Sequence, residues 1–199
     1  MAIDNSKEIF DFLYKNIDGR AISLAAKTKL TSWYMGHIYG EVTYRGFLRI
    51  LALVKPNKNE VFYDLGSGTG KAVLLAAMLT DFSKVVGVEL LKDLYDTSLQ
   101  IANDYKKFIG QDNISPVNFI HGDFKETDFS DADVIFMNAT CWKYDFDLLF
   151  LRKLEQLKKG TRIIMSSMCL ELQNYTIKSI GHIDFSWGKE EVFIHEKLT

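Results

Sequence analysis

The stretch "VFYDLGSGTGKAV", Val61 to Val73, predicts a ligand-binding loop between a β-strand and an α-helix. An apolar run precedes Gly66, Gly68 and Gly70, and a second apolar run follows Lys71. Glycine adopts positive φ angles without strain and lets the backbone approach a ligand where any Cβ would clash. We therefore begin with the question of which ligand this loop binds.

The glycine spacing argues against the two common phosphate-binding loops. A P-loop needs Gly-x4-Gly-Lys-Ser/Thr, but Leu65 and Ala72 occupy the positions of the first glycine and of the hydroxyl residue. A dinucleotide loop needs G-x-G-x-x-G, and its third glycine would fall at Lys71. Asp64 at the mouth of the loop would also repel a pyrophosphate.

S-adenosyl-L-methionine fits the same residues better. It has no phosphate and carries a cationic sulfonium and an ammonium, so nearby carboxylates attract it. Glu89 ends the next strand-like run, where an acid can accept hydrogen bonds from ribose hydroxyls. Asp123 follows the third run and can accept from the adenine amino group, and Phe124 offers an aromatic face to the base. We therefore predict this cofactor.

Alternating strand-like and helix-like runs predict an α/β fold. Strands followed by helices indicate a Rossmann-like, seven-stranded, mostly parallel sheet with helices on both faces. The last two strands read as an antiparallel hairpin that turns at Gly188 and Lys189. The predicted strands are 60–65, 84–90, 117–123, 131–138, 161–167, 175–187 and 190–198. The predicted helices between them are 71–80, 94–109 and 145–160, the last with Gly160 as its C-cap.

Residues before the sheet predict a small helical cap. Helices are expected over 6–16, with Ser6 as N-cap, and over 21–36. A further helix over 46–54 is stopped by Pro56.

Composition narrows the class of protein. The 199 residues carry 24 basic and 26 acidic side chains and a net charge of −2, without a basic block. We therefore expect no direct nucleic-acid binding. The longest apolar run, 72–79, is too short to span a membrane. Two cysteines and scattered histidines predict no metal site and a reducing, cytoplasmic location.

Several motifs together resemble one enzyme family. The motifs are "YGEVTY" (39–44), the glycine loop, "GVEL" (87–90), "HGDF" (121–124), "DVIFMNAT" (133–140) and "FSWGKEEVFIHEKL" (185–198). They resemble the class I S-adenosylmethionine-dependent, disruptor-of-telomeric-silencing-type (non-SET) histone-lysine methyltransferases, from about Tyr39 to the end of the chain. Together with the change from short helices to alternating strands and helices, this resemblance predicts a helical cap over 1–45 and a class I methyltransferase domain over 46–199.

The resemblance also implies roles for individual residues. Asn138 would be the catalytic residue, beside the methyl group and the incoming amine. An amine acceptor must be neutral, and aromatic walls would favour the neutral form. The candidate walls are Tyr44, Trp142, Trp187 and Phe193, and the implied cofactor-binding residues are Tyr39, Glu41, Val42, Asp64, Gly66, Gly68, Gly70, Lys71, Glu89, Asp123 and Phe124.

Two departures from the family concern the acceptor side. The family has Asn-Asn-Phe where this chain has Asn138-Ala139-Thr140, so Trp142 would have to supply an aromatic ring there. The family's channel tyrosine has its nearest counterpart in Phe193, which lacks the hydroxyl. Cys141 is expected to pack rather than to act as a nucleophile.

The predicted activity is methyl transfer to a lysine ε-amino group of a protein substrate. Methylation of RNA or of a small molecule is the first alternative. A non-catalytic adenosyl-binding module is the second.

Overall fold

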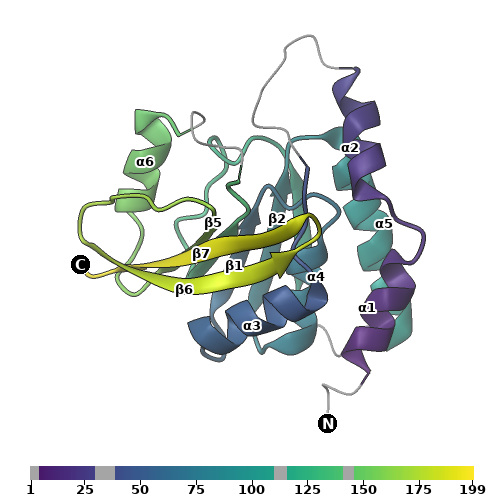
Figure 1. Ribbon diagram of the computed structural model, residues 1–199, viewed down its shortest axis with the longest axis horizontal. Coiled ribbons are helices and arrows are strands. Elements are labelled where there is room, and N and C mark those ends of the chain that lie inside the picture. The colour runs from purple at the N-terminus through teal and green to yellow at the C-terminus, as the bar shows by residue number, and fades with distance from the viewer. Residues whose placement is uncertain (1–4, 30–38, 110–115, 141–145) are drawn as a thin grey trace.

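The computed structural model describes residues 5–29, 39–109, 116–140 and 146–199 and shows the predicted α/β architecture (Figure 1). Its seven strands form one sheet in the order β3-β2-β1-β4-β5-β7-β6. The strands are β1 (Val61–Leu65), β2 (Lys84–Glu89), β3 (Val117–His121), β4 (Val134–Met137), β5 (Arg162–Ser166), β6 (Tyr175–Phe185) and β7 (Gly188–Lys197). The helices are α1 (Ser6–Tyr14), α2 (Gly19–Lys27), α3 (Tyr44–Val54), α4 (Lys71–Leu79), α5 (Lys92–Ile109) and α6 (Leu148–Glu155).

Strand directions place the predicted loops at one edge of the sheet. Strands β1 to β5 pair in parallel, and β7 inserts antiparallel between β5 and β6. Because parallel strands end at the same edge, the glycine loop, Glu89 and Asn138 lie on one side of the molecule. The predicted mostly parallel sheet with a C-terminal hairpin is thus confirmed.

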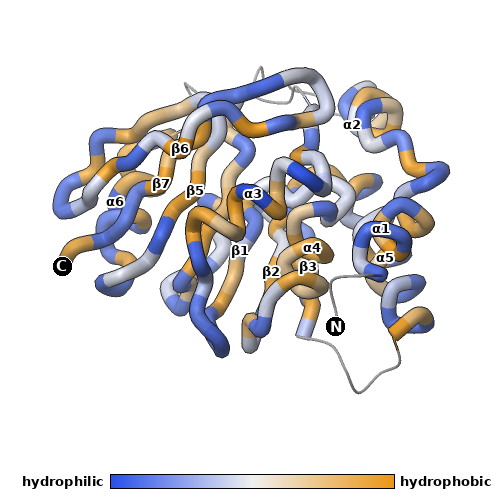
Figure 2. Tube along the Cα trace, turned by 60° about the horizontal axis from the view of Figure 1, so that its bottom comes forward, coloured by the Kyte–Doolittle hydropathy of each residue, from blue (hydrophilic) through white to orange (hydrophobic). Residues whose placement is uncertain are grey.

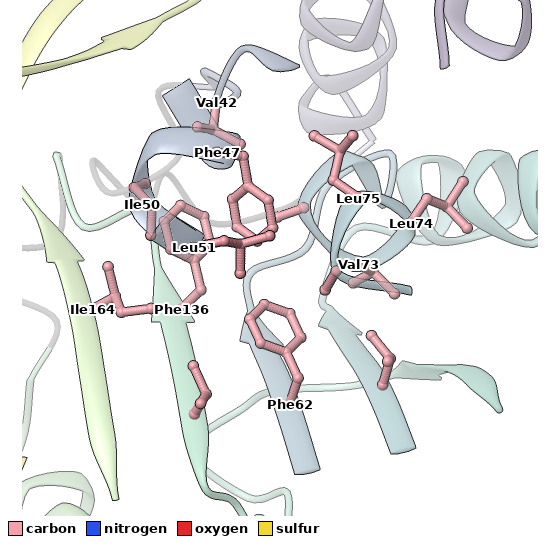
Figure 3. Packing of buried hydrophobic residues seen from close by; sticks show 14 of the residues in the cluster. Val42, Phe47, Ile50, Leu51, Phe62, Val73, Leu74, Leu75, Phe136 and Ile164 are labelled. Carbon is pink, nitrogen blue, oxygen red and sulfur yellow. The ribbon is translucent and has the colours of Figure 1, made fainter. Parts of the chain in front are cut away.

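Helices cover both faces of the sheet. On one face, Phe47 of α3 packs edge-on against Phe62 of β1 and Phe136 of β4 (Figure 3). On the other face, Phe150 and Leu154 of α6 are fully buried and belong to a second hydrophobic cluster. Figure 2 shows that hydrophobic residues gather on α4 and on the central strands, which the helices cover. Burial on both sides fixes the plane in which the strand ends meet.

The N-terminal helices α1 and α2 lie against α5 (Figure 1). Phe10, Leu13 and Tyr14 of α1 share a hydrophobic cluster with residues of α3 and α4. The cap thereby reaches the start of α4, which follows the glycine loop. A domain boundary near residue 45 stays a prediction.

The ends of two predicted helices were wrong. Ser6 is the first residue of α1 rather than its N-cap, and its hydroxyl contacts the Tyr44 hydroxyl at 2.7 Å. Helix α6 ends at Glu155, so Gly160 is not its C-cap. Gly160 instead has φ +84° in the turn before β5, where its N–H donates to the Lys197 carbonyl.

Two further bounds differ from the prediction. The hairpin turns at Ser186 and Trp187, because Phe185 already pairs with Gly188. Helix α2 ends at Lys27, and residues 30–36 of the helix predicted over 21–36 lie outside the described residues. None of the helices that the structure describes is both long and apolar enough to cross a membrane.

Candidate active site

A small, partly open pocket lies at the carboxyl ends of β1 and β4. The glycine loop and the segment before α3 form its walls. It is lined by Tyr39, Gly40, Glu41, Val42, Asp64, Gly66, Ser67, Gly68, Lys71, Ala72, Phe136 and Asn138. Eight of these residues belong to the predicted site: Tyr39, Glu41, Val42, Asp64, Gly66, Gly68, Lys71 and Asn138.

The glycine loop needs its glycines for two physical reasons. Gly66, Gly68 and Gly70 have φ of +87°, +55° and +83°, a region that other residues rarely adopt. A Cβ at Gly68 would also lie 2.7 Å from the Tyr39 hydroxyl, and one at Gly70 would lie 2.6 Å from the Phe119 ring. Gly70 therefore shapes the loop from below, outside the pocket lining.

Glu41 is the centre of a polar network on the pocket wall. Its carboxylate accepts hydrogen bonds from the Tyr39 hydroxyl and the Thr69 hydroxyl, and it forms a 2.6 Å ion pair with Lys71. Tyr14 of α1 donates to the Thr69 carbonyl, and the Lys71 ammonium lies 5.1 Å from the centre of the Tyr14 ring. The network joins the cap to the glycine loop.

The end of the C-terminal hairpin holds this wall in place. Val42 forms an antiparallel bridge with Phe185 of β6, and the Ser186 N–H donates to the Glu41 carbonyl at 2.8 Å. Trp187 packs on Gly40 so closely that a Cβ there would lie 2.1 Å from its ring. The sequence analysis missed Gly40, whose only signal was its place between Tyr39 and Glu41.

Two buried acidic side chains lie at the glycine loop, Asp64 in the pocket lining and Glu89 beneath the loop. Asp64 and Glu89 are 3% and 7% exposed. Burial, and then the charges of Glu89 and Glu41, raises the pKa of Asp64 well above its usual value. Burial also raises the pKa of Glu89, which the N–H groups of Leu91 and Gly68 partly offset by donating to its two carboxylate oxygens. Glu89 thus orients the glycine loop from beneath.

Asn138 faces the Gly40 segment with its amide nitrogen. This nitrogen donates to the Gly40 carbonyl at 2.7 Å. The amide oxygen accepts hydrogen bonds from the Ser166 hydroxyl at 2.6 Å and from the Thr140 hydroxyl at 3.2 Å. The oxygen expected to face an amine therefore has two hydroxyl partners here. The sequence analysis missed Ser166, which is fully buried at the end of β5.

Comparison with known proteins shows the family of this chain. The family model of the histone methylation protein DOT1 matches residues 20–186. The chain belongs to the DOT1 family. It is 34% identical over 129 residues to a histone-lysine N-methyltransferase, H3 lysine-79 specific, of Dictyostelium discoideum. That match covers 60% of this chain and 7% of the relative, so the chain spans only a small part of the relative's length.

A shorter relative and a solved structure extend the DOT1 comparison. A protein-lysine N-methyltransferase of Saccharolobus islandicus is 29% identical over 164 residues, which is 81% of this chain and 95% of the relative. An RNA methyltransferase of Salinibacter ruber, crystallised with S-adenosyl-L-homocysteine, has a TM-score of 0.53 and 24% identity over 76% of this chain and 90% of its own. The latter likeness shows the fold alone.

Four predicted cofactor-binding residues lie outside the pocket lining: Gly70 and Glu89 beneath the loop, and Asp123 and Phe124 after β3. Asp123 accepts a 2.8 Å hydrogen bond from the Lys125 N–H at the end of β3. Phe124 packs against Phe150 of α6, with ring centres 5.1 Å apart. The neighbouring Gly122 N–H donates to the Glu89 carbonyl, which puts this turn beside β2. The adenine-binding role of Asp123 and Phe124 stays a prediction.

The aromatic side chains expected to wall a DOT1-type acceptor channel are dispersed. Trp187 contacts Gly40 at the pocket wall. Tyr44 points to α1, with its hydroxyl at Ser6, and Phe193 lies in β7 outside the pocket lining. Trp142 and Cys141 lie outside the described residues.

Three more residues that line the pocket, Ala72, Phe136 and Ser67, were not predicted from the sequence. Ala72 and Phe136 sit in apolar runs that favour core packing. Ser67 lies within the quoted loop, is 7% exposed, and its hydroxyl has no hydrogen-bond partner in the structure. Among the residues that the structure describes, no cluster of three His, Cys, Asp or Glu side chains could hold a metal ion.

Proposed function

We propose that this chain is an S-adenosyl-L-methionine-dependent methyltransferase that methylates a lysine ε-amino group of a protein. The observation that carries the proposal is the pocket itself. It combines a glycine loop with the carboxylates of Glu41 and Asp64, and Glu89 lies beneath the loop. Such a pocket repels a pyrophosphate and attracts a ligand that carries an ammonium and a sulfonium.

The residues present fit this cofactor. Gly66 and Gly68 leave the floor without side chains, and the Ser67 hydroxyl is buried without a partner in the protein. A buried polar atom of this kind favours a ligand or water that satisfies it. Asp64 faces no described basic side chain within 4.0 Å, so its buried carboxyl can ionise in response to a bound cation.

The chain's own residues account for positioning in the reaction. S-adenosyl-L-methionine supplies an electrophilic methyl group on its sulfonium. Asn138 fixes the Gly40 carbonyl at the pocket wall, and Ser166 fixes Asn138. In-line displacement depends mainly on such alignment. A lysine amine has a pKa near ~10.4 in water, and the low polarity of a closed site favours its neutral, reactive form.

A protein substrate is favoured over RNA by two observations. The Saccharolobus relative of nearly the same length is named a protein-lysine N-methyltransferase. The chain has a net charge of −2, which gives no electrostatic basis for binding a polyanion. For the same reason nucleosomes should be poor acceptors for the lone chain. A cytoplasmic location accords with two cysteines in 199 residues.

The first test is calorimetry followed by methyl labelling. S-adenosyl-L-methionine and S-adenosyl-L-homocysteine should both bind, whereas NAD and ATP should not. Radiolabelled cofactor should then label protein lysines in a lysate and in free core histones, and label intact nucleosomes less. Absence of binding by either adenosyl ligand would refute the proposal, and label confined to RNA or metabolites would refute the lysine assignment.

Cofactor binding should also release a proton. The raised pKa of Asp64 keeps its carboxyl protonated in the empty pocket above the usual range for aspartate. This contribution favours the folded empty protein at low pH and is lost as the pH rises through the raised pKa. A bound cation stabilises the ionised form, so affinity should increase with pH, by at most about tenfold per pH unit.

The measurement is titration calorimetry between about pH 5.5 and pH 8 in buffers of different ionisation enthalpy. Asp64→Asn should abolish the pH dependence, and the exposed Asp96→Asn should retain it. A wild-type affinity that is constant over this range would contradict the assignment of Asp64.

A further inference from the structure

A chain of hydroxyl groups connects the pocket wall to a carboxylate on the outside. The Thr140 hydroxyl lies 3.2 Å from the Asn138 amide oxygen and 3.1 Å from the Ser167 hydroxyl. The Ser167 hydroxyl donates to Glu190 of β7 at 2.6 Å. Three polar contacts therefore join Glu190 to Asn138, which lines the pocket, and two of them are hydrogen bonds at any one time, because the two hydroxyls carry one proton each.

A second route reaches the same carboxylate from the opposite part of the wall. The Trp187 indole N–H donates to the other oxygen of Glu190 at 2.9 Å, and the ring packs on Gly40. Gly40 in turn accepts the hydrogen bond from Asn138. The two routes close a circuit, which we call the Glu190 circuit; its members are Gly40, Trp187, Glu190, Ser167, Thr140 and Asn138.

Glu190 is the only ionisable member of this circuit. Both of its hydrogen-bond donors are neutral, and a carboxylate retains further acceptor positions after accepting two bonds. Among the residues that the structure describes, no Lys, Arg or His side chain forms an ion pair with it. Its negative charge is therefore not neutralised within the described structure.

We propose that Glu190 determines specificity for the methyl acceptor by binding a cationic amine beside the pocket. This inference rests on the proposed function, because it assigns the second substrate of the same site. A primary ammonium offers three donors to a carboxylate and is attracted by its charge. The neutral side chains of Asn138 and Thr140 lie between Glu190 and the pocket, where the uncharged form of the amine reacts.

The charge of Glu190 matters in this proposal rather than its hydrogen bonds. Glu190→Gln keeps the size and an acceptor for the Trp187 N–H, but removes the charge. Glu191→Gln is the matched control, since this carboxylate is next along β7 and points to the other face, where it accepts from the Ser179 hydroxyl. Ser167→Ala breaks the circuit and leaves the charge.

The experiment measures binding of two small probes in the presence of S-adenosyl-L-homocysteine. The probes are Nα-acetyl-lysine amide and its uncharged analogue Nα-acetyl-norleucine amide, and Kd is obtained by NMR titration. The wild type should prefer the lysine probe by about 3- to 10-fold at low salt, because solvent partly screens a carboxylate that is only partly buried. Glu190→Gln should lose this preference, whereas Glu191→Gln and Ser167→Ala should keep it.

Turnover provides a second readout. With the lysine probe as acceptor, Glu190→Gln should raise KM by a similar factor with little change in kcat, and the salt dependence of KM should disappear. Equal binding of the two probes by the wild type would overturn the inference. So would a loss in Ser167→Ala as large as that in Glu190→Gln, which would indicate a purely structural role. Failure of the proposed function is separate, since it appears as absent binding of the adenosyl ligands.

Discussion

Replacement of Glu41 by alanine should weaken S-adenosyl-L-methionine binding by about 10- to 150-fold, the loss expected for one hydrogen bond that involves a charged group. Glu41 accepts hydrogen bonds from Tyr39 and Thr69 and pairs with the Lys71 ammonium. Its removal leaves the Lys71 charge uncompensated in a pocket that should bind a cation. The affinity for S-adenosyl-L-homocysteine, which lacks the sulfonium charge, should fall less.

A double-mutant cycle separates the two effects at Glu41. Lys71→Met in the Glu41→Ala background removes the uncompensated charge, so it should restore part of the affinity for the sulfonium form. Lys71→Met alone should have the smaller effect of leaving Glu41 without its cation. Calorimetric Kd values for both adenosyl ligands give the coupling energy. Additive losses would show that Lys71 and Glu41 do not act together in binding.

Replacement of Arg162 by methionine should lower the free energy of unfolding by about 3–5 kcal/mol, the usual cost of removing one partner of a buried ion pair. Arg162 begins β5, is 9% exposed, and forms an ion pair with Glu60. Its guanidinium also donates to the carbonyls of Val54 and Lys55 at 3.0 and 3.2 Å. These carbonyls end α3, which lies over the sheet.

The expected fall in Tm is about 6–20 °C, since a chain of this length loses about 2–4 °C per kcal/mol. Thermal and urea unfolding of Arg162→Met measure it. Adding Glu60→Gln should recover part of the loss, because the buried unpaired charge is then absent. Lys58→Met, an exposed charge in the same loop, is the control and should be close to neutral. A loss below about 1 kcal/mol would show that the α3 end does not depend on Arg162.

Arg162→Met should leave cofactor affinity unchanged at temperatures where the variant is folded. Arg162 begins β5 at the amino end, whereas the pocket lies at the carboxyl ends of β1 and β4. The Glu41 and Arg162 variants thus test opposite ends of the sheet. A large change in affinity without unfolding would contradict this separation.

The sequence alone determined the features that depend on local pattern. The apolar runs on either side of the three glycines predicted a strand, a turn and a helix. Glycine suits such a turn because it adopts positive φ angles without strain, and Gly66, Gly68 and Gly70 all have positive φ. Alternation of strands and helices fixed a mostly parallel sheet. Since the strands of such a sheet end at one edge, the pattern also brought Glu89 and Asn138 to the side of the glycine loop.

The tertiary structure alone decided how the pocket walls are made. Val42 pairs with Phe185, and Trp187 packs on Gly40. The Ser166 hydroxyl donates a hydrogen bond to the amide oxygen of Asn138. The hairpin therefore turns at Ser186 and Trp187, two residues before the glycine that predicted the turn.

The contacts of Arg162 were likewise decided by the tertiary structure, since its partners in and after α3 lie far from it in the sequence. Such contacts leave no periodic trace in the sequence: each joins segments that meet only after the sheet has brought them together. Propensity and spacing report on neighbours along the chain. The orientation of a side chain such as Asn138 or Glu190 depends on neighbours in space.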